Sequence, residues 1–457
     1  MSNGWDTHGR AGYLQDSGKP RLMVVHPYLK SKTVINSKKR SPEARLQEAV
    51  GLASAIDVDV VAYENIPLGR VTPKTFIGSG KCEELKAYIE AQEIEIVVCD
   101  ADLSPIQHRN LETALATKVI DRTALILEIF GARASTKEGE LQVELAHLTY
   151  QKSRLVRSWT HLERQRGGKG FMGGPGERQI ESDRRMISDR ISLLKKQLTQ
   201  VTRTRSLQRA KRQKAPYPVI ALVGYTNAGK STLFNMLTHA EVLAEDMLFA
   251  TLDPTMRAVT LSGGRKVILS DTVGFISELP HMLIAAFRAT LEEVLSADII
   301  VHVRDSSHAD SNLQKDDVIS VLSELGVEMD MEKTKTPILE ALNKVDLLDE
   351  AERDALNNLM ERNPHMYAVS GLTGEGTEGL LTAIDEILSK TNITVEVTVP
   401  FNEGAKRAFL YAHGEIEKET ASEDGQHYTV TIDPAKWGQF QKMFGFSDGD
   451  ALEDEEY

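Results

Sequence analysis

Short apolar runs that alternate with amphipathic stretches organise the first part of the chain. Three runs rich in β-branched residues predict strands: RLMVVH (21–26), VDVVAYE (58–64) and IEIVVCD (94–100). The stretches between them predict helices over 41–56, where Ser41 is the N-cap and Pro42 takes the first position, and over 82–92. Because strands alternate with helices, we expect a small, mostly parallel sheet.

Beyond residue 133 the periodicity becomes helical over two long stretches. Residues 140–166 contain no Pro or Gly, and their leucines recur at helical spacing: Leu141, Leu145, Leu148 and Leu155. A second pattern covers about 180–211, with apolar residues three or four positions apart: Ile187, Ile191, Leu194, Leu198 and Val201. The segment between them, GGKGFMGGPG (167–176), holds six glycines. We therefore expect an antiparallel helical hairpin with this segment at its tip.

The sequence KAPYP (214–218) ends the helical pattern and opens another α/β region. There VIALVG (219–224) predicts a buried strand, and strands and helices alternate to about residue 390. From residue 392, TVEVTVP and HYTVTID predict two strands of a small terminal unit. The expected parts are a disordered stretch (1–20), an N-terminal α/β domain (21–132), a helical hairpin (133–213), a second α/β domain (214–391) and a C-terminal α/β unit with an acidic tail (392–457).

The composition is that of a soluble globular protein. The chain has 457 residues, of which 41% are apolar and 26% charged, and this length suits two to four domains. Its two cysteines, Cys82 and Cys99, cannot form a disulfide framework or a four-ligand zinc site, which predicts a reduced, cytoplasmic setting. No apolar run approaches about 18 residues and the first ten residues lack an apolar signal core, so we expect neither membrane insertion nor secretion.

Charge is strongly segregated along the chain. The formal net charge is −13, yet residues 151–214 contain eighteen Lys or Arg and five Asp or Glu. This segment therefore carries +13 and the remainder −26. Such a block favours a polyanionic partner for the hairpin, on an otherwise acidic protein. The alternative is a solvated helical hairpin that is rich in Lys and Arg without binding a polyanion.

The segment GYTNAGKST (224–232) matches the phosphate-loop pattern G-x-x-x-x-G-K-[ST]. It follows an apolar strand and precedes TLFNMLT, a plausible helix, which is the context that the pattern requires. Loop amides and the helix N-terminus can bind the α- and β-phosphates. Lys230 can reach the β- and γ-oxygens, and the Ser231 hydroxyl can ligate Mg²⁺. By contrast GSGK (78–81) lacks the spacing and predicts a turn.

Two later motifs fit the recognition of guanine. In NKVD (343–346), Asp346 can accept hydrogen bonds from both N1–H and the exocyclic amine of guanine, a donor pair that adenine lacks. The stem of Lys344 can cover one face of the base. About 25 residues later, VSGLTGEG (369–376) can offer backbone amides near Ser370 and Gly371 to the guanine O6.

Two loops between these motifs are candidates for sensing the third phosphate. In SDTVGF (270–275), Asp271 can hold Mg²⁺ through water, and the Gly274 amide can contact the γ-phosphate. In LFATLDPT (248–255), Thr251 is the expected second hydroxyl ligand of Mg²⁺, with Thr255 as the alternative. Loops that are ordered by the γ-phosphate and released after hydrolysis form a switch.

These motifs define the expected site. The predicted catalytic residues are Lys230, Thr251, Asp271 and Gly274. The predicted metal ligands are Ser231 and Thr251. The predicted nucleotide contacts are Gly224, Tyr225, Thr226, Asn227, Ala228, Gly229, Lys230, Ser231, Phe249, Ala250, Thr251, Leu252, Asp253, Asp271, Thr272, Val273, Gly274, Asn343, Lys344, Val345, Asp346, Ser370, Gly371 and Leu372.

The set GYTNAGKSTLFN, FATLDPT, DTVGFI, NKVD and SGLTGEG resembles the HflX family within the Obg–HflX group of translational GTPases, and residues 153–185 resemble that family's own signature. The resemblance runs from about residue 21 to the end of the GTPase domain, and the terminal unit is less distinctive. It implies a P-loop GTPase domain with a mostly parallel sheet, preceded by a small α/β domain with a long antiparallel helical hairpin. It also implies a monomer that binds GTP with Mg²⁺ and the large (50S) ribosomal subunit, in ribosome splitting, rescue or biogenesis.

The resemblance further implies that the hairpin tip reaches into ribosomal RNA. Basic side chains around a pliant tip suit crowded phosphates, and an aromatic ring there can stack on an exposed base. The expected RNA contacts are Arg154, Arg157, Arg164, Arg166, Lys169, Phe171 and Arg178.

Phe275 stands directly after DTVG, where many small GTPases place a glutamine that orients the attacking water. An apolar side chain cannot do this, so we expect slow intrinsic hydrolysis that the ribosome accelerates. Two other functions compete with this interpretation. One is an RNA-remodelling ATPase with a second nucleotide site in the N-terminal domain, where no second phosphate-loop pattern occurs. The other is a regulatory binding module in which hydrolysis is incidental.

Overall fold

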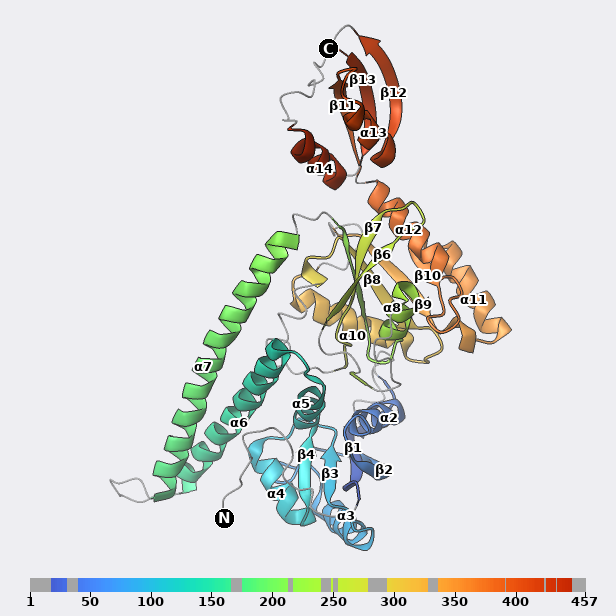
Figure 1. Ribbon diagram of the computed structural model, residues 1–457. Helices are drawn as coiled ribbons and strands as arrows, with labels where there is room; N and C mark the ends of the chain where they lie inside the picture. Colours follow the sequence, from blue (N-terminus) through green and yellow to red (C-terminus); the bar gives the residue numbers. More distant parts are fainter. Residues whose placement is uncertain are drawn as a thin grey trace.

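The computed structural model describes residues 18–30, 40–165, 175–212, 217–239, 248–249, 254–277, 294–327, 336–390, 392–422, 425–432 and 434–445. Three sheets follow one another along the molecule, of four, six and three strands. Figure 1 shows the first sheet at one end, the six-stranded sheet in the middle and the smallest sheet at the other end, with two long helices at the side. No helix among these residues combines the length and the apolar character that crossing a bilayer requires.

The N-terminal unit is a four-stranded, fully parallel sheet with helices on its faces, as the apolar runs predict. Its strand order is β2-β1-β3-β4. Its elements are β1 (Arg21–Leu29), α2 (Pro42–Ala53), β2 (Asp59–Leu68), α3 (Ser79–Ala91), β3 (Ile96–Cys99), α4 (Pro105–Leu115), β4 (Lys118–Asp121) and α5 (Arg122–Arg133). Strand β1 lies inside the sheet and is buried on both faces, which explains its continuous apolar run. Ser41 caps α2 as predicted, because its hydroxyl accepts from the Ala44 amide at 3.1 Å.

The predicted helical hairpin is formed by α6 (Lys137–Gln165) and α7 (Pro175–Arg212), which lie antiparallel beside the other parts (Figure 1). Ile191 and Leu194 of α7 are buried, in agreement with their helical spacing. Across the pair, the Arg190 guanidinium meets the Glu144 carboxylate at 2.6 Å. Residues 167–174 of the predicted tip (167–176) lie outside the described residues.

The central unit is a six-stranded sheet of order β10-β9-β8-β5-β7-β6. All neighbours are parallel except β6 and β7, which pair antiparallel. Its elements are β5 (Val219–Gly224), α8 (Lys230–Thr238), β6 (Thr255–Thr260), β7 (Lys266–Asp271), β8 (Ile299–Asp305), α10 (Ser311–Glu324), β9 (Ile338–Asn343), the 3-10 helix η1 (Val345–Leu347), α11 (Glu350–Glu361), β10 (Met366–Ala368) and α12 (Thr377–Ser389). Because β5 is internal, the loop that leaves its carboxyl end opens at the sheet edge where ligands bind in such folds.

The terminal unit is an antiparallel sheet of order β11-β13-β12 with two helices. Its elements are β11 (Ile393–Val399), α13 (Gly404–His413), β12 (Gly414–Ser422), β13 (Gly425–Ile432) and α14 (Pro434–Phe444). Both strands predicted from the sequence are present, and Tyr428, Trp437 and Phe440 are buried in its core. Residues 1–17 of the predicted disordered start (1–20) lie outside the described residues, and so does the acidic end of the chain (446–457).

Candidate nucleotide site

The predicted phosphate loop joins β5 to the N-terminus of α8, and glycines are required at both of its ends. A Cβ on Gly224 would come within 2.2 Å of the Val303 carbonyl oxygen in the neighbouring strand β8. Gly229 is the N-cap of α8 with φ of 83°, and a Cβ there would lie 2.3 Å from Asn343 Nδ2. The α8 N-terminus has no side-chain cap, so its amides are available to an anion.

Lys230 is buried at the start of α8, and its ammonium group donates to the Tyr225 carbonyl at 2.8 Å. Burial lowers the pKa of Lys230 to about 8, and the nearby Asp271 carboxylate opposes this shift. A bound polyphosphate would favour the charged lysine again. The place of Lys230 at the start of α8 is compatible with the prediction that it meets the β- and γ-phosphates.

Ser231 and Asp271 bring a hydroxyl and a carboxylate together. The Ser231 hydroxyl donates to Asp271 Oδ2 at 2.7 Å. Oxygen donors of these two kinds fit Mg²⁺, which in phosphate-loop proteins takes its other ligands from water and the nucleotide. Of the two hydroxyls considered for the second ligand, Thr251 lies outside the described residues, with Ala250, Leu252 and Asp253. Thr255 begins β6 and faces Asp271 across the antiparallel ladder.

The segment after Asp271 lies directly against the phosphate loop. The Phe275 amide donates to the Gly224 carbonyl at 3.1 Å, and the Thr226 amide donates to the Phe275 carbonyl at 2.7 Å. A Cβ on Gly274 would come within 2.8 Å of Thr226 Cγ2 and 3.1 Å of Lys230 Nζ. Only glycine fits this approach, which brings the Gly274 backbone beside the Lys230 ammonium group.

Phe275 is 1% exposed and belongs to the apolar cluster that also contains Val273. Its side chain is therefore part of the core and does not reach towards the phosphate loop's solvent side. This position agrees with the expectation that Phe275 cannot orient a water molecule. The Thr272 hydroxyl donates to the Leu222 carbonyl at 2.6 Å. This hydrogen bond ties the segment after Asp271 to β5.

The two base-recognition motifs are joined to the phosphate loop through Asn343. Its Nδ2 donates to the Ala228 carbonyl at 2.9 Å, and its Oδ1 accepts from the Gly371 amide at 2.9 Å. Ser370 donates its hydroxyl to Asp346 Oδ1 at 2.6 Å. Motifs separated by more than a hundred residues thus form one hydrogen-bonded arrangement.

Lys344 has a left-handed backbone with φ of 64°, and its ammonium group lies 2.8 Å from Asp305 Oδ2 at the end of β8. This ion pair fixes the Lys344 ammonium group at the carboxyl end of β8. The sequence reasoning did not include Asp305, although a carboxylate at the carboxyl end of the apolar strand IIVHVRD is a signal that could have found it. Leu372, a predicted contact, is 72% exposed beside the same motifs.

Two predicted nucleotide contacts face the N-terminal unit. The Phe249 ring packs edge-on against Phe130 of α5 with centroids 4.7 Å apart. The Tyr225 hydroxyl donates to the Glu48 carboxylate of α2. The Tyr225 hydroxyl is thus engaged by α2, and only the Tyr225 backbone is left for the predicted contact with a nucleotide.

Of the predicted RNA contacts, Arg154 is engaged inside the protein. Its guanidinium forms an ion pair with the buried Asp121 and lies over the Tyr150 ring at 4.5 Å. Its side chain is only 20% exposed. The side chains of the remaining predicted RNA contacts lie outside the described part of the chain: Arg157, Arg164, Arg166, Lys169, Phe171 and Arg178.

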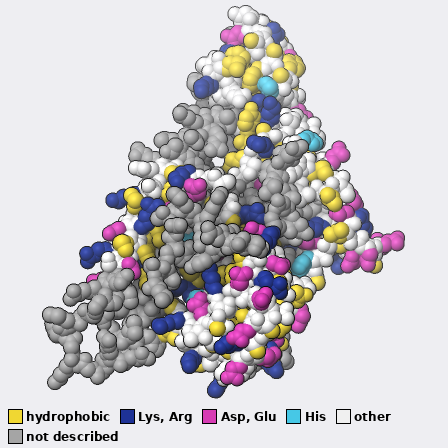
Figure 2. All heavy atoms as spheres, turned by 60° about the horizontal axis from the view of Figure 1, so that its bottom comes forward, with side chains coloured by type: hydrophobic (Ala, Val, Ile, Leu, Met, Phe, Trp, Pro, Cys, Tyr) yellow, Lys and Arg dark blue, Asp and Glu magenta, His cyan; other side chains and the backbone are white. Residues whose placement is uncertain are grey.

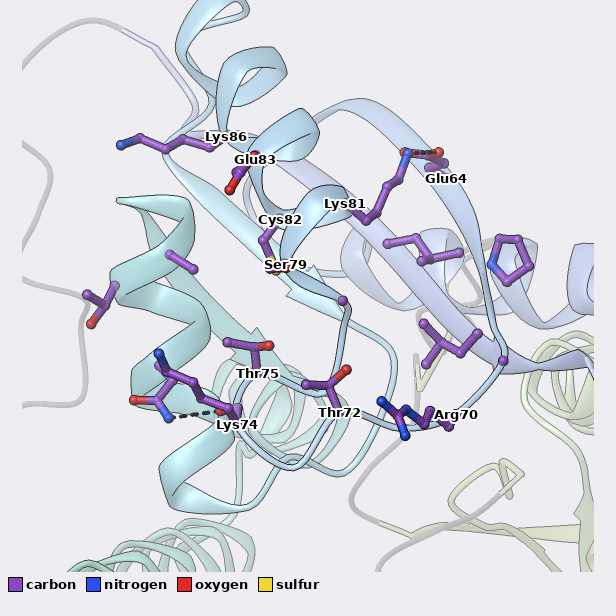
Figure 3. Close-up of a pocket in the computed structure, with 18 residues that line it drawn as sticks. Glu64, Arg70, Thr72, Lys74, Thr75, Ser79, Lys81, Cys82, Glu83 and Lys86 are labelled. Carbon is purple, nitrogen blue, oxygen red and sulfur yellow. Dashed lines mark hydrogen bonds and ion pairs between the residues drawn. The ribbon is translucent and has the colours of Figure 1, made fainter.

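A separate cavity of about 1550 Å³ lies in the N-terminal unit between β2, α3 and α4 (Figure 3). The sequence GSGK lies at its edge, but Gly78 is the N-cap of α3 and Ser79–Lys81 form its first turn, so the predicted turn is instead a helix start. The Lys81 ammonium is held by Glu64 at 2.6 Å and Glu84 at 2.7 Å. Its charge is already compensated, unlike that of a phosphate-loop lysine.

The fold and the site define a class of protein. A central strand, a glycine-bounded loop with a buried lysine, a carboxylate beside the loop hydroxyl and a linked NKVD motif are the parts of a P-loop GTPase. Four family models match the chain in order: "GTP-binding GTPase N-terminal" over 43–131, "GTP-binding GTPase Middle Region" over 133–212, "50S ribosome-binding GTPase" over 219–344 and "HflX C-terminal domain" over 355–450.

Curated relatives specify the family. The chain is 51% identical to GTPase HflX of Magnetococcus marinus, over 87% of this chain and 90% of that protein. It is 45% identical to GTPase HflX of Lacrimispora saccharolytica over 83% and 86% of the two chains. It is 43% identical to GTPase HflX of Escherichia coli K12 over 83% and 87%. The chain belongs to the HflX family of GTPases, which confirms the resemblance in its motifs.

Proposed function

We propose that this HflX-family protein is a Mg²⁺-dependent GTPase that binds the large ribosomal subunit as a monomer and uses hydrolysis to time its release. It acts in ribosome splitting and rescue or in subunit biogenesis. The observation that carries the proposal is the Asn343 side chain, which joins the phosphate loop to the guanine-recognition motif. The match of residues 219–344 to a family described as 50S ribosome-binding GTPases supports the partner.

Within this site each residue has a proposed role. Lys230 and the α8 N-terminus bind the phosphates, and Asp346 reads the guanine edge. Ser231 and Thr251 would hold Mg²⁺, with Asp271 as the expected partner through water, and the bound ion would neutralise charge on the phosphates. The Gly274 amide contacts the γ-phosphate. The proximity of Gly274 to Lys230 and of Ser231 to Asp271 supports these assignments.

The basic hairpin is the proposed contact with ribosomal RNA. The net charge of +13 over residues 151–214 supports this role. On the face of the N-terminal unit that Figure 2 shows, Lys and Arg side chains lie interspersed with Asp and Glu. That face is therefore not a uniformly positive surface of the kind that binds a polyanion. The hairpin side chains beyond Arg154 are therefore the proposed RNA contacts.

The proposed cycle includes slow hydrolysis away from the ribosome. Phe275, buried where other GTPases place a water-orienting glutamine, supports a low intrinsic rate. Ordering of the segments around Thr251 and Gly274 on the ribosome then raises that rate. We expect the ribosome to supply the missing constraint on the attacking water.

Co-sedimentation with purified large subunits at moderate salt tests the proposal. The protein is mixed with a non-hydrolysable GTP analogue, GDP or no nucleotide, with small subunits as the control. Retention on large subunits with the analogue alone supports a ribosome-dependent switch. Equal retention in all three states would favour a binding module, since equal affinity shifts no equilibrium. Lack of retention in every state would refute the ribosomal partner.

A further inference from the structure

Glu48 of α2 reaches from the N-terminal unit into the GTPase unit. Its Oε1 accepts from the Ser277 hydroxyl at 2.8 Å, and its Oε2 accepts from the Tyr225 hydroxyl. The Tyr225 oxygen in turn accepts from the Ser277 amide at 2.8 Å. Tyr225 directly follows the first glycine of the phosphate loop, and Ser277 lies three residues after Gly274. One carboxylate therefore holds both segments that flank the phosphate site.

Arg122 of α5 provides the matching positive charge. It donates to Glu48 Oε1 at 2.5 Å and to the Ser277 carbonyl at 3.0 Å, and it is also paired with Asp100 at 2.6 Å. The Arg122 and Glu48 side chains are 5% and 8% exposed. Burial alone raises the pKa of Glu48, but the guanidiniums of Arg122 and Arg40 hold it below its usual value, so the carboxylate stays ionised.

Apolar contacts join the same two units at the other switch segment. The Phe130 ring of α5 packs on Phe249, and a Cβ on Gly51 of α2 would lie 3.2 Å from Leu248 Cδ1. Leu248 and Phe249 immediately precede the segment with Thr251. The N-terminal unit thus touches the chain beside both segments that are expected to respond to the γ-phosphate.

The residue before Arg122 connects this arrangement to the hairpin. Asp121 is fully buried, accepts from the Tyr150 hydroxyl at 2.7 Å and forms an ion pair with Arg154. Both partners lie on α6, the first hairpin helix. Two consecutive residues therefore bind different parts of the protein. Asp121 binds helix α6 of the hairpin, and Arg122 binds Ser277 and Glu48.

We propose that Glu48 and Arg122 are positioning residues of the GTPase site that couple the nucleotide-dependent segments to the hairpin through Asp121. A shift of Ser277 would rearrange the buried ion pair between Arg122 and Glu48. Such a pair changes between discrete arrangements of its hydrogen bonds and does not deform gradually. The coupling acts in both directions, so a hairpin held by RNA also alters the segment around Gly274. This inference rests on the proposed GTP site.

Hydrogen exchange on the full-length protein tests the coupling. Exchange in residues 118–155 is compared between the GDP and GTP-analogue complexes, and binding of both nucleotides is measured in parallel. We expect a nucleotide-dependent difference in the wild type that is lost in Glu48→Gln. Ser277→Ala removes one hydroxyl only and provides a second, milder variant, in which we expect a reduced difference.

Glu64→Gln is the matched control, because it neutralises a carboxylate of β2 that pairs with Lys81 of α3, in the same N-terminal unit but away from this arrangement. The control should retain the full difference. The inference is overturned if Glu48→Gln and Ser277→Ala bind both nucleotides and keep the difference, or if the wild type binds both and shows none. Failure of the wild type to bind GTP would instead contradict the proposed GTP site.

Discussion

The Ser370 hydroxyl donates a 2.6 Å hydrogen bond to Asp346, so the NKVD motif and the segment 369–376 hold each other directly. Ser370 is fully buried, and its hydroxyl also accepts from the Thr373 amide at 3.1 Å. The carboxylate is thereby oriented by a side chain that is itself fixed. In the proposed guanine site, Asp346 is therefore held in place before the base binds.

Asp346→Asn should reverse the choice of base. The asparagine amide would place an N–H donor opposite the donors of guanine, so no hydrogen bond forms there. Xanthine has a carbonyl oxygen in place of the guanine amine, and this oxygen can accept from the amide. We expect GTP affinity to fall by about 2–3 kcal/mol, roughly 30- to 150-fold, with a gain for xanthosine triphosphate. Titration with labelled nucleotides measures both. Unchanged GTP affinity would show that Asp346 does not read the base.

Nucleotide affinity should decline as pH rises above about 8. The pKa of Lys230 is lowered to about 8, below its ordinary 10.5, so the free site loses its positive charge in this range. Bound phosphate restores the charged form, which means that binding takes up a proton. At pH 9 we expect uptake of about 0.9 protons for each nucleotide, and a fall in affinity of up to about tenfold for each pH unit between 8 and 10.5.

Calorimetry in buffers of different ionisation enthalpy measures this uptake. Lys230→Arg is the matched variant, because a guanidinium stays charged throughout the range. We expect the variant to take up clearly fewer protons at pH 9 than the wild type, because only uptake at guanine N1 remains, even if its affinity is lower. Equal uptake in both proteins would assign the proton to another group.

Gly274→Ala should impair hydrolysis more than GDP binding. The added carbon would lie 2.8 Å from Thr226 Cγ2 and 3.0 Å from Thr226 Cα, so the segment must move away from the phosphate loop. Overpacking of this kind costs about 1–3 kcal/mol, which corresponds to a roughly 5- to 150-fold lower rate if the Gly274 amide acts on the γ-phosphate. Single-turnover hydrolysis and GDP titration separate the two effects.

Gly379→Ala is the control for this substitution. Gly379 lies in α12, and a Cβ there meets no atom within 4 Å. Alanine in an exposed helical position favours the helix, so stability should rise slightly with hydrolysis unchanged. A comparable loss of hydrolysis in both variants would contradict a specific role for Gly274.

Arg154 and the basic residues nearer the tip should differ in their effects. Arg154→Gln leaves the buried Asp121 with the Tyr150 hydroxyl but without its cation, so we expect a loss of about 2–3 kcal/mol in unfolding free energy. Neutralising Arg164, Arg166 and Lys169 together should leave stability nearly unchanged. It should lower the salt dependence of large-subunit binding by about 2–3 in log–log slope, if each contacts one phosphate.

Denaturant unfolding and co-sedimentation over a range of salt concentrations measure the two properties. Arg184→Gln, an exposed position on α7, serves as the surface control. A stability loss for the triple variant, or an unchanged slope, would contradict the assignment of these residues to RNA. An unchanged unfolding free energy in Arg154→Gln would mean that the ion pair contributes little.

The sequence by itself determined the parts of the molecule that depend on local pattern. Buried parallel strands such as β1 and β5 are continuous apolar runs, and the hairpin helices show uninterrupted helical spacing. Gly224, Gly229 and Lys230 follow from the geometry of a phosphate loop. The pattern did not reveal α4, β4 and α5. Strand β4 (KVID) has only two consecutive apolar residues, whereas the equally short β3 lies within the longer run IEIVVCD.

Only the tertiary structure decided which distant groups meet. Asn343 binds the phosphate loop because β9 and β5 lie in the same sheet on either side of β8. Arg154 pairs with Asp121, and Tyr225 with Glu48, because buried charges and hydroxyls require partners that may lie anywhere along the chain. Residue type predicts that such a group needs a partner, whereas packing of the sheets and helices decides which partner it receives.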